Sequence, residues 1–124
     1  HVLPADWIDV VTQLILRTDP SLVAENHQKV AHTPFVFNLD WAVVLMNEAD
    51  ILASATEHVG PQLGRQLASE WAQRQHPLHQ VVGTDAGRLH FLSSLRFSTP
   101  ASLALRMPQT VANQITDLKN QLAS

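Results

Sequence analysis

The chain has 124 residues, of which 45% are hydrophobic and 15% charged, a composition typical of one folded domain rather than a disordered segment. It contains no cysteine, which excludes disulfides, thiol nucleophiles and cysteine-ligated zinc or iron–sulfur sites. The formal net charge is −3, which argues against nucleic-acid binding by the whole surface. No apolar run reaches the roughly 20 residues of a membrane span, so we expect no membrane partner.

The charge is divided by position along the chain. Residues 1–59 carry a formal charge of −6, from two cations and eight acids, whereas residues 60–124 carry +3, from six cations and three acids. This division favours either a basic face that meets an anionic partner or pairing between two copies of the chain. The alternative is that the two parts interleave in the fold and their fields cancel.

The N-terminal residues 1–4 contain neither an initiator Met nor the basic segment of a leader. We interpret this start as a processed leader or as a residue left from an expression tag. We expect the protein in the cytoplasm. Because the start could be that of a processed leader, export stays open as the alternative.

Prolines that precede amphipathic stretches predict where helices begin, because a first-turn proline loses no helical hydrogen bond. Asp19 and Thr99 add a capping side chain directly before such a proline. We expect helices near residues 4–18, 20–31, 38–59, 61–76, 100–106 and 108–123. The tryptophans lie on the predicted apolar stripes and are expected in the core: Trp7, Trp41 and Trp71. The apolar segment 33–37 is expected to be extended and held in the core.

Residues 79–97 are compatible with two structures. A Val-Val-Gly segment at 81–83, a turn and alternating apolar residues up to Phe97 predict a β-hairpin. Three leucines between residues 89 and 95 also fit a helix capped by Asp85. We favour the hairpin, so the predicted fold is a mainly α, single-domain helical bundle over residues 1–124 with a small β-hairpin near 79–97. An all-α fold is the alternative.

Two features favour a homodimer. The longer second strand of such a hairpin would have an unpaired edge from about Ser93, and an isolated ribbon needs a further partner. The last predicted helix carries an apolar stripe with 4-3-4 spacing, which resembles a coiled-coil seam. The residues that we expect at the dimer interface are Ser93, Leu95, Val111, Ile115, Leu118 and Leu122.

The sequence contains no recognisable catalytic or metal-binding motif. Its seven histidines form no His-Glu-x-x-His and no Glu-x-x-His pair, and no serine lies in a Gly-x-Ser-x-Gly elbow. We therefore predict no catalytic residues, no enzyme activity, no metal and no cofactor. A metal site assembled from residues far apart in the sequence stays open, and its candidates are Glu57, His58, His76, His79 and His90.

A long helix, a turn at Gly60, a second helix and a hairpin follow one another in the order of a winged-helix DNA reader. In that arrangement Arg65 and Arg74 would lie on the reading helix, and Arg88 at the tip of the wing. Cations are sparse across residues 60–106, and acidic residues lie near the reading helix. DNA binding is therefore the alternative function.

The function that we expect is that of a non-enzymatic protein-interaction or regulatory module, which acts through surface complementarity on an unknown protein partner. A small hydrophobic-ligand-binding protein, with a pocket between helices, is the second alternative. The residues that we expect at a partner surface are Arg65, Arg74, Arg88, Arg96 and Phe97.

Overall fold

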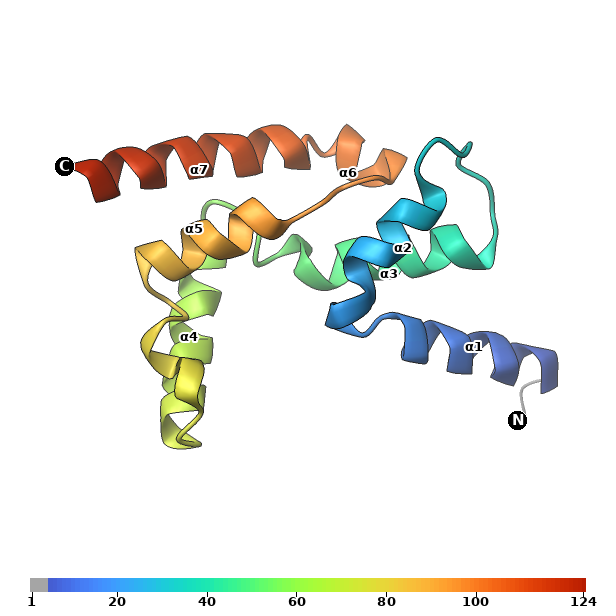
Figure 1. Ribbon diagram of the computed structural model, residues 1–124, viewed down its shortest axis with the longest axis horizontal. Helices are drawn as coiled ribbons and strands as arrows, with labels where there is room; N and C mark the ends of the chain where they lie inside the picture. The colour runs from blue at the N-terminus through green and yellow to red at the C-terminus, as the bar shows by residue number, and fades with distance from the viewer. Residues whose placement is uncertain (1–4) are drawn as a thin grey trace.

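The structure, a computed structural model, describes residues 5–124, which form seven α-helices and two short 3-10 helices (Figure 1). In chain order these are α1 (Ala5–Arg17), η1 (Pro20–Leu22), α2 (Val23–Val30), α3 (Leu39–Leu52), α4 (Gly60–Gln73), η2 (Pro77–Gln80), α5 (Asp85–Ser94), α6 (Pro100–Ala104) and α7 (Met107–Ala123). No strand occurs between residues 5 and 124, so the all-α alternative is confirmed and the β-hairpin near 79–97 is wrong. The start of the first helix at residue 4 and the processed N-terminus lie outside the described residues.

Residues 77–94 form η2, a turn and α5 in place of the hairpin. The hydroxyl of Thr84 accepts a hydrogen bond from the backbone N–H of Gly87 at 3.0 Å, which caps the first turn of α5. Gly83, with a φ of +86°, reverses the chain just before this cap in a conformation that favours glycine. Ser93 lies in the last turn of α5, so the unpaired strand edge expected there does not exist.

Helix α3 ends at Leu52 instead of continuing to residue 59, and residues 53–59 form turns. The guanidinium of Arg88 donates to the carbonyl oxygens of Ser54 at 3.1 Å and Thr56 at 3.0 Å. In a continuous helix these carbonyls would accept bonds from the following turn. A side chain from α5 therefore holds these carbonyl oxygens, of which that of Thr56 also accepts the backbone N–H of Gly60 at 3.2 Å.

The apolar core consists of two clusters. The first lies between α2 and α3, and its buried residues are Val30, Trp41 and Val44. The second joins α5 and α7 to the 53–59 segment, and its buried residues are Ala55, Leu92, Met107, Val111 and Leu118. We call them the first and second core clusters. Each is small for a chain of this length, so the contacts between them matter for the fold.

Buried polar side chains connect the helices around these clusters. Asn26 of α2 donates to Asn47 of α3 at 3.0 Å and to the carbonyl oxygen of Arg17 at 2.7 Å. Glu48 of α3 is 2% exposed and accepts hydrogen bonds from the backbone N–H and the hydroxyl of Thr99. The first contact attaches α2 to the end of α1, and the second attaches α3 to the segment before α6.

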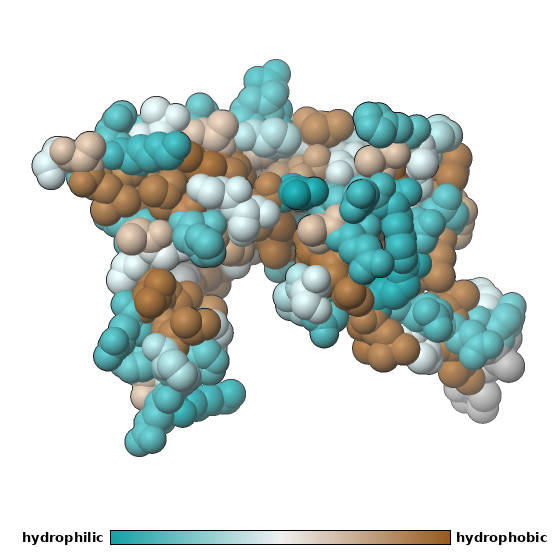
Figure 2. All heavy atoms as spheres, viewed as in Figure 1, coloured by the Kyte–Doolittle hydropathy of each residue, from teal (hydrophilic) through white to brown (hydrophobic). Residues whose placement is uncertain are grey.

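Helices α1 and α4 project as two separate arms, which both the ribbon (Figure 1) and the space-filling view (Figure 2) show. Helix α4 packs chiefly on η2, and α1 packs on α3. The accessible surface of the chain is 8730 Å², whereas a compact monomer of 13.7 kDa exposes about 6,600 Å². The open arrangement therefore exposes about 2,100 Å² more than a compact chain would.

The segment 33–37 is an exposed, irregular loop and not the core segment that its composition predicts. Trp41 Nε1 donates to the carbonyl oxygen of Pro34 at 2.8 Å, and Phe35 packs edge-to-face on Trp41 with ring centroids 5.0 Å apart. The side chain of Phe37 is fully exposed. The loop therefore covers Trp41, but much of its own apolar surface faces solvent.

Candidate functional site

The outward side of α1 carries an apolar stripe that no other part of the described chain covers. Its residues recur at spacings of three and four, and they are Trp7, Ile8, Val11 and Ile15. The side chains of Trp7 and Ile15 are 59% and 69% exposed. In Figure 2, brown atoms stand among teal ones on the arm that α1 forms. Trp7 is therefore not in the core, because α1 attaches to α3 on another side, where Arg17 pairs with Asp40 at 2.8 Å. We call these four residues the α1 stripe.

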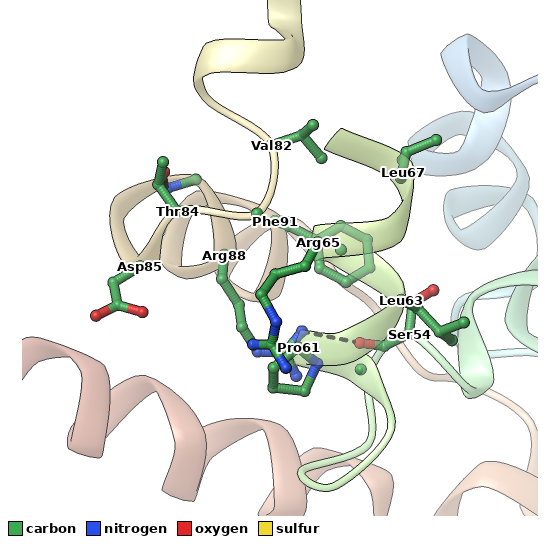
Figure 3. Close-up of a pocket in the computed structure, with 14 residues that line it drawn as sticks. Ser54, Pro61, Leu63, Arg65, Leu67, Val82, Thr84, Asp85, Arg88 and Phe91 are labelled. Atoms are coloured by element: carbon green, nitrogen blue, oxygen red, sulfur yellow. Dashed lines mark hydrogen bonds between the residues drawn. The ribbon is translucent and has the colours of Figure 1, made fainter. Parts of the chain in front are cut away.

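A pocket of about 150 Å³ lies between α4 and α5 (Figure 3). Its apolar lining consists of Pro61, Leu63, Leu67, Val82 and Phe91. Arg65 and Arg88 both line it and extend toward Pro61 in the view of Figure 3, whereas the carboxylate of Asp85 points away from them. In residues 5–124 neither arginine lies within 4.0 Å of a carboxylate oxygen. We call this site the arginine pocket.

Within residues 5–124, the groups that accept hydrogen bonds from Arg88 are neutral. Besides the carbonyl oxygens of Ser54 and Thr56, its guanidinium donates to Oε1 of Gln114. These bonds use three of its five N–H groups and leave two for another acceptor. A Cβ at Gly60 would collide with this guanidinium and with the carbonyl oxygen of Ser54, so Gly60 leaves the space that Arg88 occupies. Burial lowers the pKa of Arg88 below its ordinary value, because the charged form loses hydration.

A second group of polar residues lies beside a pocket of about 280 Å³, whose lining includes His27 and Arg96. Nδ1 of His27 lies 2.6 Å from the hydroxyl oxygen of Ser98. Burial lowers the pKa of His27, while the Glu48 carboxylate opposes this shift and Arg96 adds to it. Both oxygens of Glu48 accept hydrogen bonds from Thr99, so Glu48 does not orient the imidazole as the acid of a catalytic triad would. The group connects α2 and α3 to the segment before α6.

Two of the five residues predicted for a partner surface line one site. Arg65 and Arg88 share the arginine pocket. Arg96 lines the second pocket, Arg74 is exposed at the C-terminal end of α4, and Phe97 packs half-buried against the second core cluster. The five residues therefore do not form a single site.

Most residues predicted for the dimer interface are used within the chain. Those that pack in or against the second core cluster are Leu95, Val111, Ile115 and Leu118. Ser93 and Leu122 are exposed. The 4-3-4 stripe of α7 attaches this helix to α5, so a contact between two copies needs another surface.

The winged-helix alternative has no wing, because residues 79–97 form η2, a turn and α5. Arg88, placed at the wing tip by that alternative, is half-buried against the 53–59 segment. The part of this arrangement that remains is two exposed arginines, Arg65 in α4 and Arg74 directly after it.

No three His, Asp or Glu side chains within residues 5–124 lie close enough to hold a metal ion. The candidates Glu57, His58, His76, His79 and His90 are therefore not assembled. His76 instead stacks on Trp71, with ring centroids 4.3 Å apart, and accepts the backbone N–H of Leu78. None of the helices in the described part of the chain is long and apolar enough to cross a membrane.

Sequence analysis missed Glu48 as a buried residue, although the sequence contains a signal for it. Trp41, Val44 and Glu48 follow one another at spacings of three and four, so Glu48 occupies a position on the apolar side of α3. A carboxylate at such a position requires buried donors. The signal does not say where those donors lie, because Ser98 and Thr99 are far away along the chain.

Comparisons with known proteins found no family model, no curated protein and no solved structure that matches this chain. Its function is therefore inferred from the geometry of its own residues, chiefly the α1 stripe and the arginine pocket.

Proposed function

We propose that the protein is a homodimeric interaction module, in which the α1 stripe of one copy packs against the same stripe of a second copy. The observation that carries the proposal is the exposure of this stripe on a projecting helix. Exposed and contiguous apolar side chains of this kind mark interaction surfaces in folded proteins. The stripe belongs to an element with defined structure, so it can pack against a partner without first becoming ordered.

The exposed area supports a second copy as the occupant. The chain exposes about 2,100 Å² more than a compact monomer of its mass, and a stable interface buries about 800 Å² or more per partner. One dimer contact of about 800 Å² per partner through α1 and its surroundings would therefore account for somewhat more than a third of the excess. Small homodimers with such open protomers often fold and associate together.

The spacing of the stripe supports a helix pair. Ile8, Val11 and Ile15 have the 3-4 spacing of a coiled-coil seam, and Trp7 lies beside them. An antiparallel pair about a two-fold axis would place Val11 next to the partner's Val11 and Ile8 near the partner's Ile15. This orientation keeps the helix dipoles opposed, whereas a parallel pair would align them.

The test is light scattering coupled to size exclusion on the wild-type chain and on Val11→Asp. We expect a wild-type dimer that persists at high salt, because the contact is apolar, and a monomer for Val11→Asp. Gln13→Asp, which adds the same charge on the polar side of α1, is the matched control and should remain a dimer. A wild-type monomer at high protein concentration, or loss of the dimer in both variants, would contradict the proposal.

A further inference from the structure

We propose that the arginine pocket binds a small organic anion, whose anionic oxygens meet Arg65 and Arg88 while its apolar part occupies the space between α4 and α5. This site goes beyond the dimer contact, because none of the α1 stripe residues lines it.

The charge at the pocket supports an anion as the ligand. Arg65 and Arg88 both line this pocket, and no carboxylate within residues 5–124 lies within 4.0 Å of either. Only neutral oxygens accept from Arg88. A phosphate monoester dianion would compensate both charges and a carboxylate one of them, and either would accept the N–H groups that Arg88 has left.

The shape of the pocket limits the ligand. Its volume of about 150 Å³ is that of a cavity that accommodates one benzene-sized group. Leu63 and Phe91 provide apolar contacts on the walls, and the hydroxyl-bearing residues Ser54 and Thr84 also line the site. The ligand that fits is therefore a single ring or a short branched chain with one acidic group, and not a long acyl chain.

The position of Gly60 indicates that Arg88 is kept in this orientation by the fold. Its missing side chain leaves space for the guanidinium, and the carbonyl oxygens of Ser54 and Thr56 hold it there. The cation is therefore preorganised, so a ligand would spend little free energy on ordering it. Arg65 is exposed and makes no ion pair in the described chain, which leaves it free to adjust to the ligand.

The experiment is a titration of the full chain with benzoate and, separately, with phenyl phosphate, followed by amide chemical shifts at constant ionic strength. Benzyl alcohol, which has a similar ring and no charge, is the neutral reference. We expect both anions to shift the amide resonances of α4 and α5. The anion that binds with the higher affinity indicates whether the acidic group of the natural ligand is a carboxylate or a phosphate monoester. Benzyl alcohol should bind at least about tenfold more weakly.

The variants compare two exposed arginines, Arg65 inside α4 and Arg74 directly after its last residue. Arg65→Gln should weaken binding of the anion by about tenfold or more, whereas Arg74→Gln removes the same charge away from the pocket and should change binding little. Arg88 is not the first choice, because it also holds the 53–59 segment. Absence of saturable shifts with either anion, equal binding of benzyl alcohol, or equal weakening by both variants would overturn the proposal. None of these outcomes depends on the oligomeric state, so the test is independent of the dimer.

Discussion

Glu48 and Thr99 are joined by the most complete buried hydrogen-bonding contact in the described chain, although 51 positions separate them. The backbone N–H of Thr99 donates to Oε2 of Glu48 at 3.1 Å and its hydroxyl donates to Oε1 at 2.9 Å. The same hydroxyl oxygen accepts the N–H of Ser102 and caps α6. A single carboxylate on α3 therefore sets the position at which α6 begins.

Glu48→Gln should lower the free energy of unfolding by about 2–3 kcal/mol. Both oxygens of Glu48 accept from N–H or O–H donors. The side-chain amide of the Glu48→Gln variant would have to turn its NH₂ group toward one of these donors, so that hydrogen bond would be lost. Urea unfolding followed by circular dichroism measures the change. Glu57→Gln, at an exposed acid, is the control and should change the midpoint little. Equal effects of the two substitutions would show that the buried contact contributes nothing specific.

The stability of the fold should decrease below about pH 6.5 because of His27. Burial lowers the pKa of this imidazole in the folded chain, opposed by Glu48 and assisted by Arg96, so the unfolded chain binds the proton more tightly. The contribution of His27 is therefore complete above about pH 6.5 and is lost as the pH falls through the folded-state pKa. Urea unfolding of the wild type and of His27→Gln at several pH values measures this contribution to the free energy of unfolding. We expect a smaller loss of stability on acidification in the variant, and parallel profiles would contradict the assignment to His27.

Gly60→Ala and Gly64→Ala should have opposite effects, although both glycines lie in α4. At Gly60 a Cβ would meet the Ser54 carbonyl oxygen and the guanidinium of Arg88, so we expect a loss of about 1–3 kcal/mol. At Gly64 the nearest atom to a Cβ is Cα of Gly83 at 3.7 Å, an ordinary contact. Alanine has the higher helix propensity, so Gly64→Ala should gain about 0.5–1 kcal/mol. Thermal unfolding of the two variants distinguishes them, and destabilisation of similar size in both would count against the close packing at Gly60.

Single cysteines should report the orientation of the α1 helices, because the chain has no cysteine of its own. In the antiparallel pair Val11 lies next to the partner's Val11, so Val11→Cys should form a disulfide-linked dimer under mild oxidation. Ile15→Cys should not, because the two copies of this residue lie at opposite ends of the pair. Non-reducing gels measure the fraction linked, with Gln13→Cys as the control on the polar side of α1. Efficient linkage of Ile15→Cys to itself would indicate a parallel pair.

The helical elements were largely predictable because their signals are local. Proline at the start of α4, α6 and α7, and the caps of η1 and α6 by Asp19 and Thr99, depend on residues within one turn of the helix end. The 4-3-4 stripe of α7 likewise predicted an apolar side correctly. It did not predict the partner, since the same stripe fits an α5 helix of the chain and a second copy equally well.

The errors concern segments in which local preference and distant contacts disagree. Val81 and Val82 favour a strand, yet Gly83 and the Thr84 cap turn the chain into α5. Residues 53–59 have a helical pattern, yet they form turns whose carbonyl oxygens at Ser54 and Thr56 accept from the guanidinium of Arg88. These outcomes depend on residues brought together from different helices, which periodicity does not describe.

The sequence by itself therefore determined the helical class, the absence of cysteine chemistry and most helix starts, because composition, proline and capping act over a few residues. Only the tertiary structure decided which apolar stripes are buried. Trp7 and Trp41 lie on similar stripes, yet the first is exposed on α1 and the second is buried between α2 and α3. The tertiary structure also brought Arg65 and Arg88 to one pocket without a carboxylate partner, because the packing of α4 and α5, and not the spacing of the two residues, sets that distance.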